Sequence, residues 1–210
     1  MTKEEKDILL KEGKMLPVME HFYTLQGEGA HTGKAAYFIR LGGCDVGCHW
    51  CDVKESWDAE LHPAMDTIEI AETAAKHCKT IVLTGGEPLM WNLEVLTSKL
   101  KELGCQIHIE TSGAYPMSGH LDWITLSPKK TGLPLEEIYS KANELKVIVF
   151  NNNDFKFAEE QAAKVSENCT LYLQSEWSKR NEMYPTITDF ILENPRWRAS
   201  VQTHKYLNIP

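Results

Sequence analysis

No apolar stretch of this 210-residue chain approaches the ~20 residues that a membrane-spanning helix requires. Residues 1–7 alternate acidic and basic side chains and lack the apolar segment of a signal peptide. We therefore expect a cytoplasmic protein with no membrane partner. Repeats, low-complexity segments and linkers are also missing, so we expect one domain over residues 15–210, preceded by a polar lead-in at residues 1–14.

Positive charge is in deficit as well. The chain has 22 Lys and Arg against 30 Asp and Glu, which gives a formal net charge of -8. Phosphate recognition needs a basic surface, so this balance argues against a nucleic-acid partner. Hydrophobic residues make up 42% of the chain, which is ordinary for a globular protein of a size that buries a core unaided.

Cysteines are few, but three of the six lie within eight residues, as Cys44, Cys48 and Cys51. A cytosolic chain keeps its thiols reduced, which disfavours a disulfide framework. A four-ligand zinc site needs a second Cys or His pair at matching spacing, and the sequence shows none, although His49 or a distant histidine could complete such a site. Three thiolates on one loop can instead hold an iron–sulfur cubane and leave one iron free to bind a small molecule. The remaining cysteines, which occur singly and are expected to be buried thiols, are Cys78, Cys105 and Cys169.

Strand and helix patterns alternate along the chain. Strands are predicted over 17–23, 37–41, 80–83, 106–110, 123–126, 144–150 and 171–174. Helices are predicted over 66–76, 93–103, 134–143, 155–167 and 184–193. About six such alternations imply parallel strands with right-handed crossovers, and a closed eight-unit barrel takes about 250 residues. We therefore expect an α/β fold, a partial TIM-like barrel of roughly six parallel strands with outer helices.

Polar and glycine-bearing motifs follow the ends of these strands. They are Gly42-Gly43-Cys44, Gly85-Gly86-Glu87-Pro88, Thr111-Ser112-Gly113, Ser127-Pro128-Lys129 and Gln174-Ser175. In parallel α/β folds, ligands bind at the carboxyl edge of the strands. The sequence therefore predicts a functional site at this edge.

Two of these motifs together carry a resemblance. Three cysteines at this spacing, with Trp50 before the last of them and a later strand ending in Gly-Gly-Glu-Pro, resemble the radical S-adenosylmethionine superfamily. The resemblance implies that Cys44, Cys48 and Cys51 hold a 4Fe–4S cluster, whose open iron chelates S-adenosylmethionine. Reduction by a flavodoxin- or ferredoxin-type partner then yields a 5′-deoxyadenosyl radical, while the protein positions and shields the reactants.

Further motifs narrow the resemblance. The short chain is similar to the 7-carboxy-7-deazaguanine synthase family of queuosine and deazapurine biosynthesis. The residues that carry this similarity are Leu25–Gly29, Arg40, Cys51-Asp52, Glu110–Gly113 and Ser127–Lys129. The similarity runs from about residue 17 to the C-terminus. It implies a homodimeric lyase that converts 6-carboxy-5,6,7,8-tetrahydropterin to 7-carboxy-7-deazaguanine with loss of ammonia. The alternatives are an activating enzyme for a glycyl-radical protein and a non-catalytic zinc or iron–sulfur binding protein.

The same resemblance implies roles for single residues. Substrate contacts are expected from Leu25, Gln26, Gly27, Arg40, Thr111 and, through a terminal carboxylate, Pro210. Contacts to S-adenosylmethionine are expected from Trp50, Cys51, Asp52, Gly85, Gly86, Glu87, Gly113, Ser127, Pro128, Lys129, Gln174, Ser175, Glu176 and Trp177. Arg40 would pair with the substrate carboxylate, which suits a planar bidentate donor. His204 and Lys205 are expected to be exposed residues of the tail.

The chain departs from the family at Val53. Family members often carry Thr or Ser directly after Cys-Asp, where the hydroxyl helps to bind a magnesium ion that orients the substrate carboxylate. Valine has no oxygen, and a hard cation needs oxygen ligands. If Mg²⁺ binds here, it has to do so through Asp52, the substrate and water.

Overall fold

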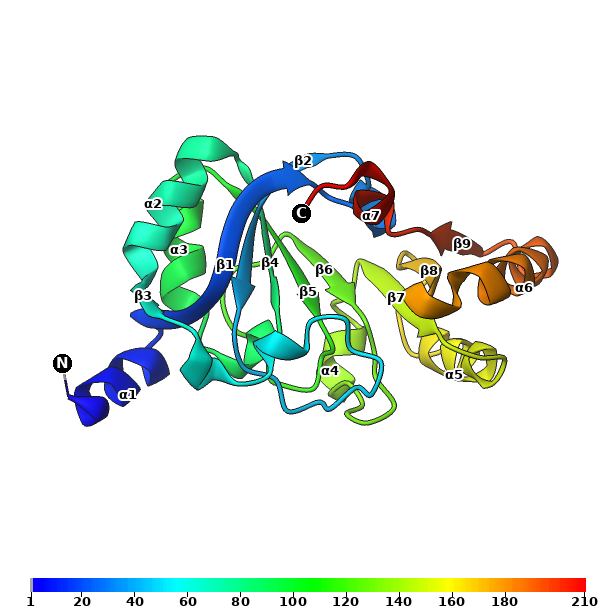
Figure 1. Cartoon of the computed structure of the whole chain (residues 1–210), viewed down its shortest axis with the longest axis horizontal. Coiled ribbons are helices and arrows are strands. Elements are labelled where there is room, and N and C mark those ends of the chain that lie inside the picture. Colours follow the sequence, from blue (N-terminus) through cyan, green and yellow to red (C-terminus); the bar gives the residue numbers. More distant parts are fainter. Residues whose placement is uncertain (1) are drawn as a thin grey trace.

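The computed structural model describes residues 2–210, and in this range nine strands form one open sheet (Figure 1). The strands are β1 (Met15–Leu25), β2 (Ala35–Leu41), β3 (Ala64–Asp66), β4 (Thr80–Gly85), β5 (Gln106–Thr111), β6 (Trp123–Leu126), β7 (Glu144–Val149), β8 (Thr170–Ser175) and β9 (Trp197–Ser200). Their order in space is β3-β1-β2-β4-β5-β6-β7-β8-β9, so the two edges do not meet. This confirms the partial barrel.

The parallel part of the sheet is longer than expected. β2 and β4 to β9 run parallel, which gives seven parallel strands where about six were predicted. β1 runs antiparallel to both β2 and β3. The sequence patterns did not predict this antiparallel edge, because a strand's hydrophobic pattern does not record the direction of its neighbour.

The described residues form seven α-helices. They are α1 (Lys3–Lys11), α2 (Thr67–His77), α3 (Glu94–Glu102), α4 (Glu136–Tyr139), α5 (Asn153–Ala162), α6 (Arg180–Glu193) and α7 (Thr203–Leu207). Short 3-10 turns are η1 (Gly29–His31), η2 (Lys54–Ser56), η3 (Ala59–Leu61), η4 (Pro88–Met90) and η5 (Trp177–Lys179). Figure 1 shows α2 and α3 against one half of the sheet and α5 and α6 against the other. In the described range, no helix combines the length and hydrophobicity needed to cross a membrane.

Local sequence signals explain several helix boundaries. Asp66 caps α2, since its carboxylate accepts hydrogen bonds from Ile68 N at 2.9 Å and Glu69 N at 3.0 Å. A reciprocal capping box between Thr2 and Glu5 starts α1, so most of the polar lead-in is a formed helix. By contrast, the helix predicted over 134–143 contracts to the four residues of α4.

Alternation along the strands separates the outer core from the barrel interior. On β7, Leu145, Val147 and Val149 pack into the core under α5 and α6. Lys146 and Ile148 between them point the other way and line an interior pocket. The same period of two residues on β5 leaves Glu110 facing the interior while Ile109 packs outward. The sheet therefore presents polar side chains to its own concave side.

Candidate active site

The strand-end loops meet at one pocket with a volume of about 250 Å³. The predicted site residues that line it are Leu25, Gln26, Gly27, Arg40, Cys44, Cys48, Trp50, Cys51, Asp52, Val53, Gly85, Gly86, Glu87, Thr111, Ser127, Lys129, Gln174, Ser175, Glu176, Trp177 and Pro210. Gly113 and Pro128 are not among the lining residues. At Gly113, a Cβ would meet Leu126 Cδ1 at 2.6 Å, so this glycine packs towards the core. The fold thus brings most of the predicted residues together.

The cysteine loop presents three free, half-buried thiols to this pocket. Gly86, at the end of β4, packs closely against the loop, because a Cβ there would lie 2.3 Å from Gly43 O and 2.8 Å from Cys44 Cβ. Burial raises the pKa of the Cys44 thiol, and burial also raises that of Cys48, partly offset there by the charge of Lys129. Within residues 2–210, no three His, Cys, Asp or Glu side chains are grouped so as to hold a single metal ion. Three soft sulfur donors on one loop are the donor set of an iron–sulfur cluster, so the residues fit that group.

Glu87 braces the ends of β4 and β5. Its carboxylate is 1% exposed and is surrounded by donors. Oε1 accepts from Leu89 N at 3.0 Å and from Thr111 Oγ1 at 2.5 Å, and Oε2 accepts from Ser112 N at 2.7 Å. With both oxygens engaged, Glu87 organises the strand ends, which leaves the backbone of Gly85 and Gly86 to face the pocket.

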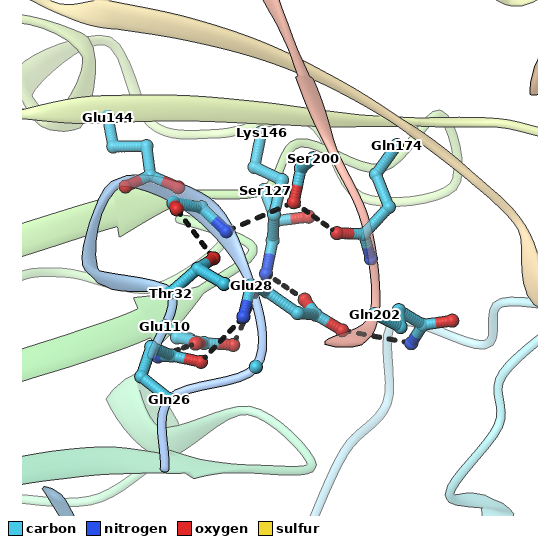
Figure 2. Close-up of polar contacts among 12 residues, drawn as sticks. Gln26, Glu28, Thr32, Glu110, Ser127, Glu144, Lys146, Gln174, Ser200 and Gln202 are labelled. Atoms are coloured by element: carbon cyan, nitrogen blue, oxygen red, sulfur yellow. Dashed lines mark hydrogen bonds and ion pairs between the residues drawn. The ribbon is translucent and has the colours of Figure 1, made fainter. Parts of the chain in front are cut away.

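A buried charge network crosses the floor of the pocket (Figure 2). Lys146 is 4% exposed, and its ammonium donates to Glu28 Oε2 and, at 3.4 Å, to Glu110 Oε2. Gln26 Nε2 donates to Glu110 Oε1 at 2.9 Å, and Gln202 Nε2 donates to Glu28 Oε1 at 2.9 Å. Figure 2 shows the Lys146 side chain reaching between the two carboxylates.

The network keeps Glu28 and Lys146 charged. Burial by itself would raise the pKa of Glu28, but the Lys146 charge and the hydrogen bonds outweigh it and lower this pKa to about 2. Burial disfavours the Lys146 ammonium too, yet the carboxylates of Glu110 and Glu28 outweigh it and raise the pKa of Lys146. The floor of the pocket therefore carries a charged pair, the Glu28 carboxylate and the Lys146 ammonium, at neutral pH.

The C-terminal segment closes one side of the pocket. Thr203 N and Thr203 Oγ1 both donate to Gly27 O at 2.9 Å. His204 is half-buried and lines the pocket, and burial lowers its pKa. Lys205, also half-buried, donates to Asp52 Oδ2 at 3.1 Å. The prediction that His204 and Lys205 are exposed tail residues is therefore wrong, because α7 folds back over the pocket.

Two further cations lie at the pocket wall. Arg40 Nε donates to Glu20 Oε1 at 2.7 Å, and this arginine lines the pocket from β2. Lys129 Nζ donates to Ser127 O at 2.8 Å and lies 5.5 Å from the centroid of the Trp50 ring. Burial lowers the pKa of Lys129. The pocket wall thus has one cation on β2 and another after β6.

The sequence patterns missed several lining residues, namely Glu28, Glu110, Lys146, Gln202 and His204. A usable signal existed for three of them, since Glu28 and Glu110 belong to the motifs Leu25–Gly29 and Glu110–Gly113. Lys146 interrupts the apolar run 144–150, and the alternation of strand side chains would have placed it on the inner face. No comparable signal marks Gln202 or His204, since they reach the pocket only through the path of the chain after β9.

Comparisons with known proteins agree with this geometry. The model of the radical SAM superfamily matches residues 38–131. A 7-carboxy-7-deazaguanine synthase of Flavobacterium psychrophilum is 64% identical over 210 residues, which cover 100% of both chains, and one of Synechocystis is 50% identical over 92% of this chain and 93% of its own. The crystal structure of QueE from Escherichia coli is similar with a TM-score of 0.81 and 28% identity, covering 95% of this chain and 99% of that one.

Proposed function

Because the chain belongs to the 7-carboxy-7-deazaguanine synthases of the radical SAM superfamily, we propose that its pocket converts 6-carboxy-5,6,7,8-tetrahydropterin to 7-carboxy-7-deazaguanine. The reaction contracts a ring and releases ammonia. It makes the protein a carbon–nitrogen lyase of queuosine biosynthesis. The observation that carries the proposal is that the three thiols, the Gly85-Gly86 backbone and the charged floor share one pocket.

The 4Fe–4S cluster and S-adenosylmethionine supply the 5′-deoxyadenosyl radical when they are bound. Cys44, Cys48 and Cys51 would hold the cluster. Gly85 and Gly86 line the pocket, where their backbone would meet the methionyl ammonium. The absence of side chains there lets the end of β4 pack against β2 and the cysteine loop. The adenosyl end would lie against the remaining wall, formed by Trp50, Ser127, Lys129, Gln174, Ser175, Glu176 and Trp177.

The polar floor suits a pterin. A pterin ring carries several N–H groups, and ionised carboxylates are acceptor-only partners for them. We assign this task to Glu28 and Glu110, which Lys146 holds in place, and Lys146 also keeps Glu28 in the charged form. Arg40 would meet the substrate carboxylate, since a guanidinium offers donors beyond the one given to Glu20. Leu25, Gly27, Thr111 and Pro210 complete this side of the pocket.

The residues do not fit the magnesium ion that the resemblance implies. Val53 lines the pocket with a side chain that has no oxygen, and its carbonyl oxygen accepts from Ser56 Oγ at 2.7 Å. The carboxylate of Asp52 already accepts from Lys205 and, at 3.4 Å, from Gln202 Nε2. No step of the proposed reaction uses a divalent cation.

We further propose a cytoplasmic homodimer that receives its electron from a flavodoxin- or ferredoxin-type reductant. The six free thiols suit a reducing compartment. Asp45, Gly47 and His49 are exposed on the cysteine loop, so a reductant can approach the cluster from outside the pocket.

The proposal is tested with the anaerobically reconstituted and reduced enzyme. Incubation with S-adenosylmethionine and 6-carboxytetrahydropterin should give 5′-deoxyadenosine and 7-carboxy-7-deazaguanine, measured by liquid chromatography and mass spectrometry. 5′-Deoxyadenosine without the deazaguanine would move the substrate to another molecule, such as a glycyl-radical protein. A colourless protein that binds zinc and makes neither product would contradict the proposal.

A further inference from the structure

A cation of the chain itself lies at the Asp52–Val53 turn. Lys205 Nζ donates to Asp52 Oδ2 at 3.1 Å and lies 4.9 Å from the centroid of the Trp177 ring. Asp52 and Trp177 both line the pocket. The Lys205 side chain keeps 23% of its surface exposed. The ammonium is thus held between a carboxylate and an aromatic face at the pocket wall, where it remains accessible.

The path of the chain fixes this position. After β9, Gln202 donates to Glu28, as Figure 2 shows, and Thr203 donates twice to Gly27 O. These contacts anchor the start of α7 on the pocket-lining loop that follows β1. Lys205 lies two residues after Thr203 on the same short helix, so these contacts hold its side chain beside Asp52.

The same turn offers little to a divalent cation. Mg²⁺ takes oxygen ligands in near-octahedral geometry, and Val53 provides none from its side chain. The Asp52 carboxylate is already paired with Lys205. A second fixed positive charge, the Arg180 guanidinium, lies 4.2 Å from the Trp177 ring centroid. Two cations of the chain, Lys205 and Arg180, therefore already lie against the Trp177 ring.

We propose that Lys205 supplies at this turn the positive charge that a divalent cation would otherwise supply, so that the substrate carboxylate is bound without Mg²⁺. The inference rests on the proposed function, which makes the substrate a carboxylate. An ammonium has three N–H donors, and Asp52 accepts one of them. Among the described residues, Lys205 Nζ has no other hydrogen-bond acceptor, so two donors are free for a carboxylate that Arg40 also meets.

Calorimetry with 6-carboxytetrahydropterin as the ligand tests the proposal by measuring its Kd. The anaerobic, cluster-loaded enzyme is first passed over a chelating resin. The wild-type Kd should change by less than about twofold when Mg²⁺ is added. Lys205→Met should weaken binding about tenfold or more, since a charge-assisted hydrogen bond is lost, and Mg²⁺ should not restore it. Lys205→Arg should retain binding. Lys156→Met, which removes a side chain that is 86% exposed on α5, is the matched control.

A second readout uses Mn²⁺ as a paramagnetic probe. Electron paramagnetic resonance should detect no stoichiometric Mn²⁺ binding to the wild type, whereas the double variant Val53→Thr/Lys205→Met should gain it. Wild-type binding of Mn²⁺, or wild-type affinity in Lys205→Met, would overturn the proposal.

Product analysis separates this inference from the proposed function. If both products form only after Mg²⁺ is added, the role of Lys205 is overturned and the synthase assignment stays intact. Neither product under any condition would overturn the synthase assignment itself.

Discussion

Glu87 Oε1 accepts a hydrogen bond from Thr111 Oγ1 at 2.5 Å, which ties the end of β4 to the end of β5. The two strands carry different parts of the site, because Gly85 and Gly86 precede Glu87 and Ser112 follows Thr111. A single buried carboxylate therefore links two pocket walls beyond the end of the β4–β5 ladder.

Replacement of this carboxylate by an amide should be costly. In Glu87→Gln an NH₂ group faces the Ser112 N–H or the Thr111 hydroxyl, so a buried donor loses its acceptor. We expect the free energy of unfolding to fall by about 2–3 kcal/mol in urea denaturation. Glu160→Gln, at an α5 side chain that is 57% exposed, should stay within about 0.5 kcal/mol of the wild type. Equal stability of Glu87→Gln and the wild type would show that the brace contributes nothing.

Loss of one thiol should prevent cluster binding. Cys48→Ala leaves two thiolates on the loop, and we expect reconstituted protein to be colourless, with iron and sulfide near background and no 5′-deoxyadenosine formed. Cys78→Ala removes a half-buried thiol that does not line the pocket and should keep the brown colour and the iron content. A brown, active Cys48→Ala protein would remove Cys48 from the ligand set.

The guanidinium of Arg40 should contribute to substrate affinity rather than to S-adenosylmethionine affinity. In Arg40→Ala we expect the Kd for 6-carboxytetrahydropterin to rise about tenfold or more, as a charge-assisted contact is lost. Arg40→Lys should recover only part of this, because an ammonium cannot bind a carboxylate in the bidentate manner. Glu20→Gln removes the partner of Arg40 and keeps the arginine, and is the control. Unchanged substrate affinity in Arg40→Ala would place the carboxylate elsewhere.

Glu28 should make stability depend on acid pH. Its pKa falls from 4.5 to about 2 on folding, so its contribution is complete above pH 4.5 and is lost as the pH falls from there towards 2. At pH 7 the Glu28→Gln protein should be less stable than the wild type by on the order of 3 kcal/mol. This difference should shrink in urea denaturation between pH 4.5 and 3. Glu137→Gln, on an exposed face of α4, should show no such convergence. A difference that stays constant with pH would mean that Glu28 acts by packing alone.

Much of the fold and the chemistry could be predicted from local patterns. The cysteine spacing and the Gly-Gly-Glu-Pro strand end indicated the superfamily, which the comparisons confirm. The alternation of strands and helices predicted the partial barrel, because hydrophobic periodicity is a property of neighbouring residues. The Asp66 cap was readable for the same reason.

The pairing of β1 and the path of the tail could not be predicted in this way. β1 carries an ordinary strand pattern, and its antiparallel register with β2 depends on the loop between them. His204 and Lys205 belong to a polar segment that looks like a tail until α7 is seen to fold over the pocket.

The sequence by itself determines the residues for a three-thiolate cluster and for close backbone approach to a ligand. Each of these features depends on a few adjacent positions, so a short stretch is enough to show it. The charged floor of the pocket is different. Lys146 and Glu28 lie 118 positions apart, and nothing in either stretch specifies the other. Their burial is tolerable only when both are brought together, because an unpaired charge inside the barrel would lose its hydration without compensation. Tertiary structure alone therefore decides which of the polar residues become a site.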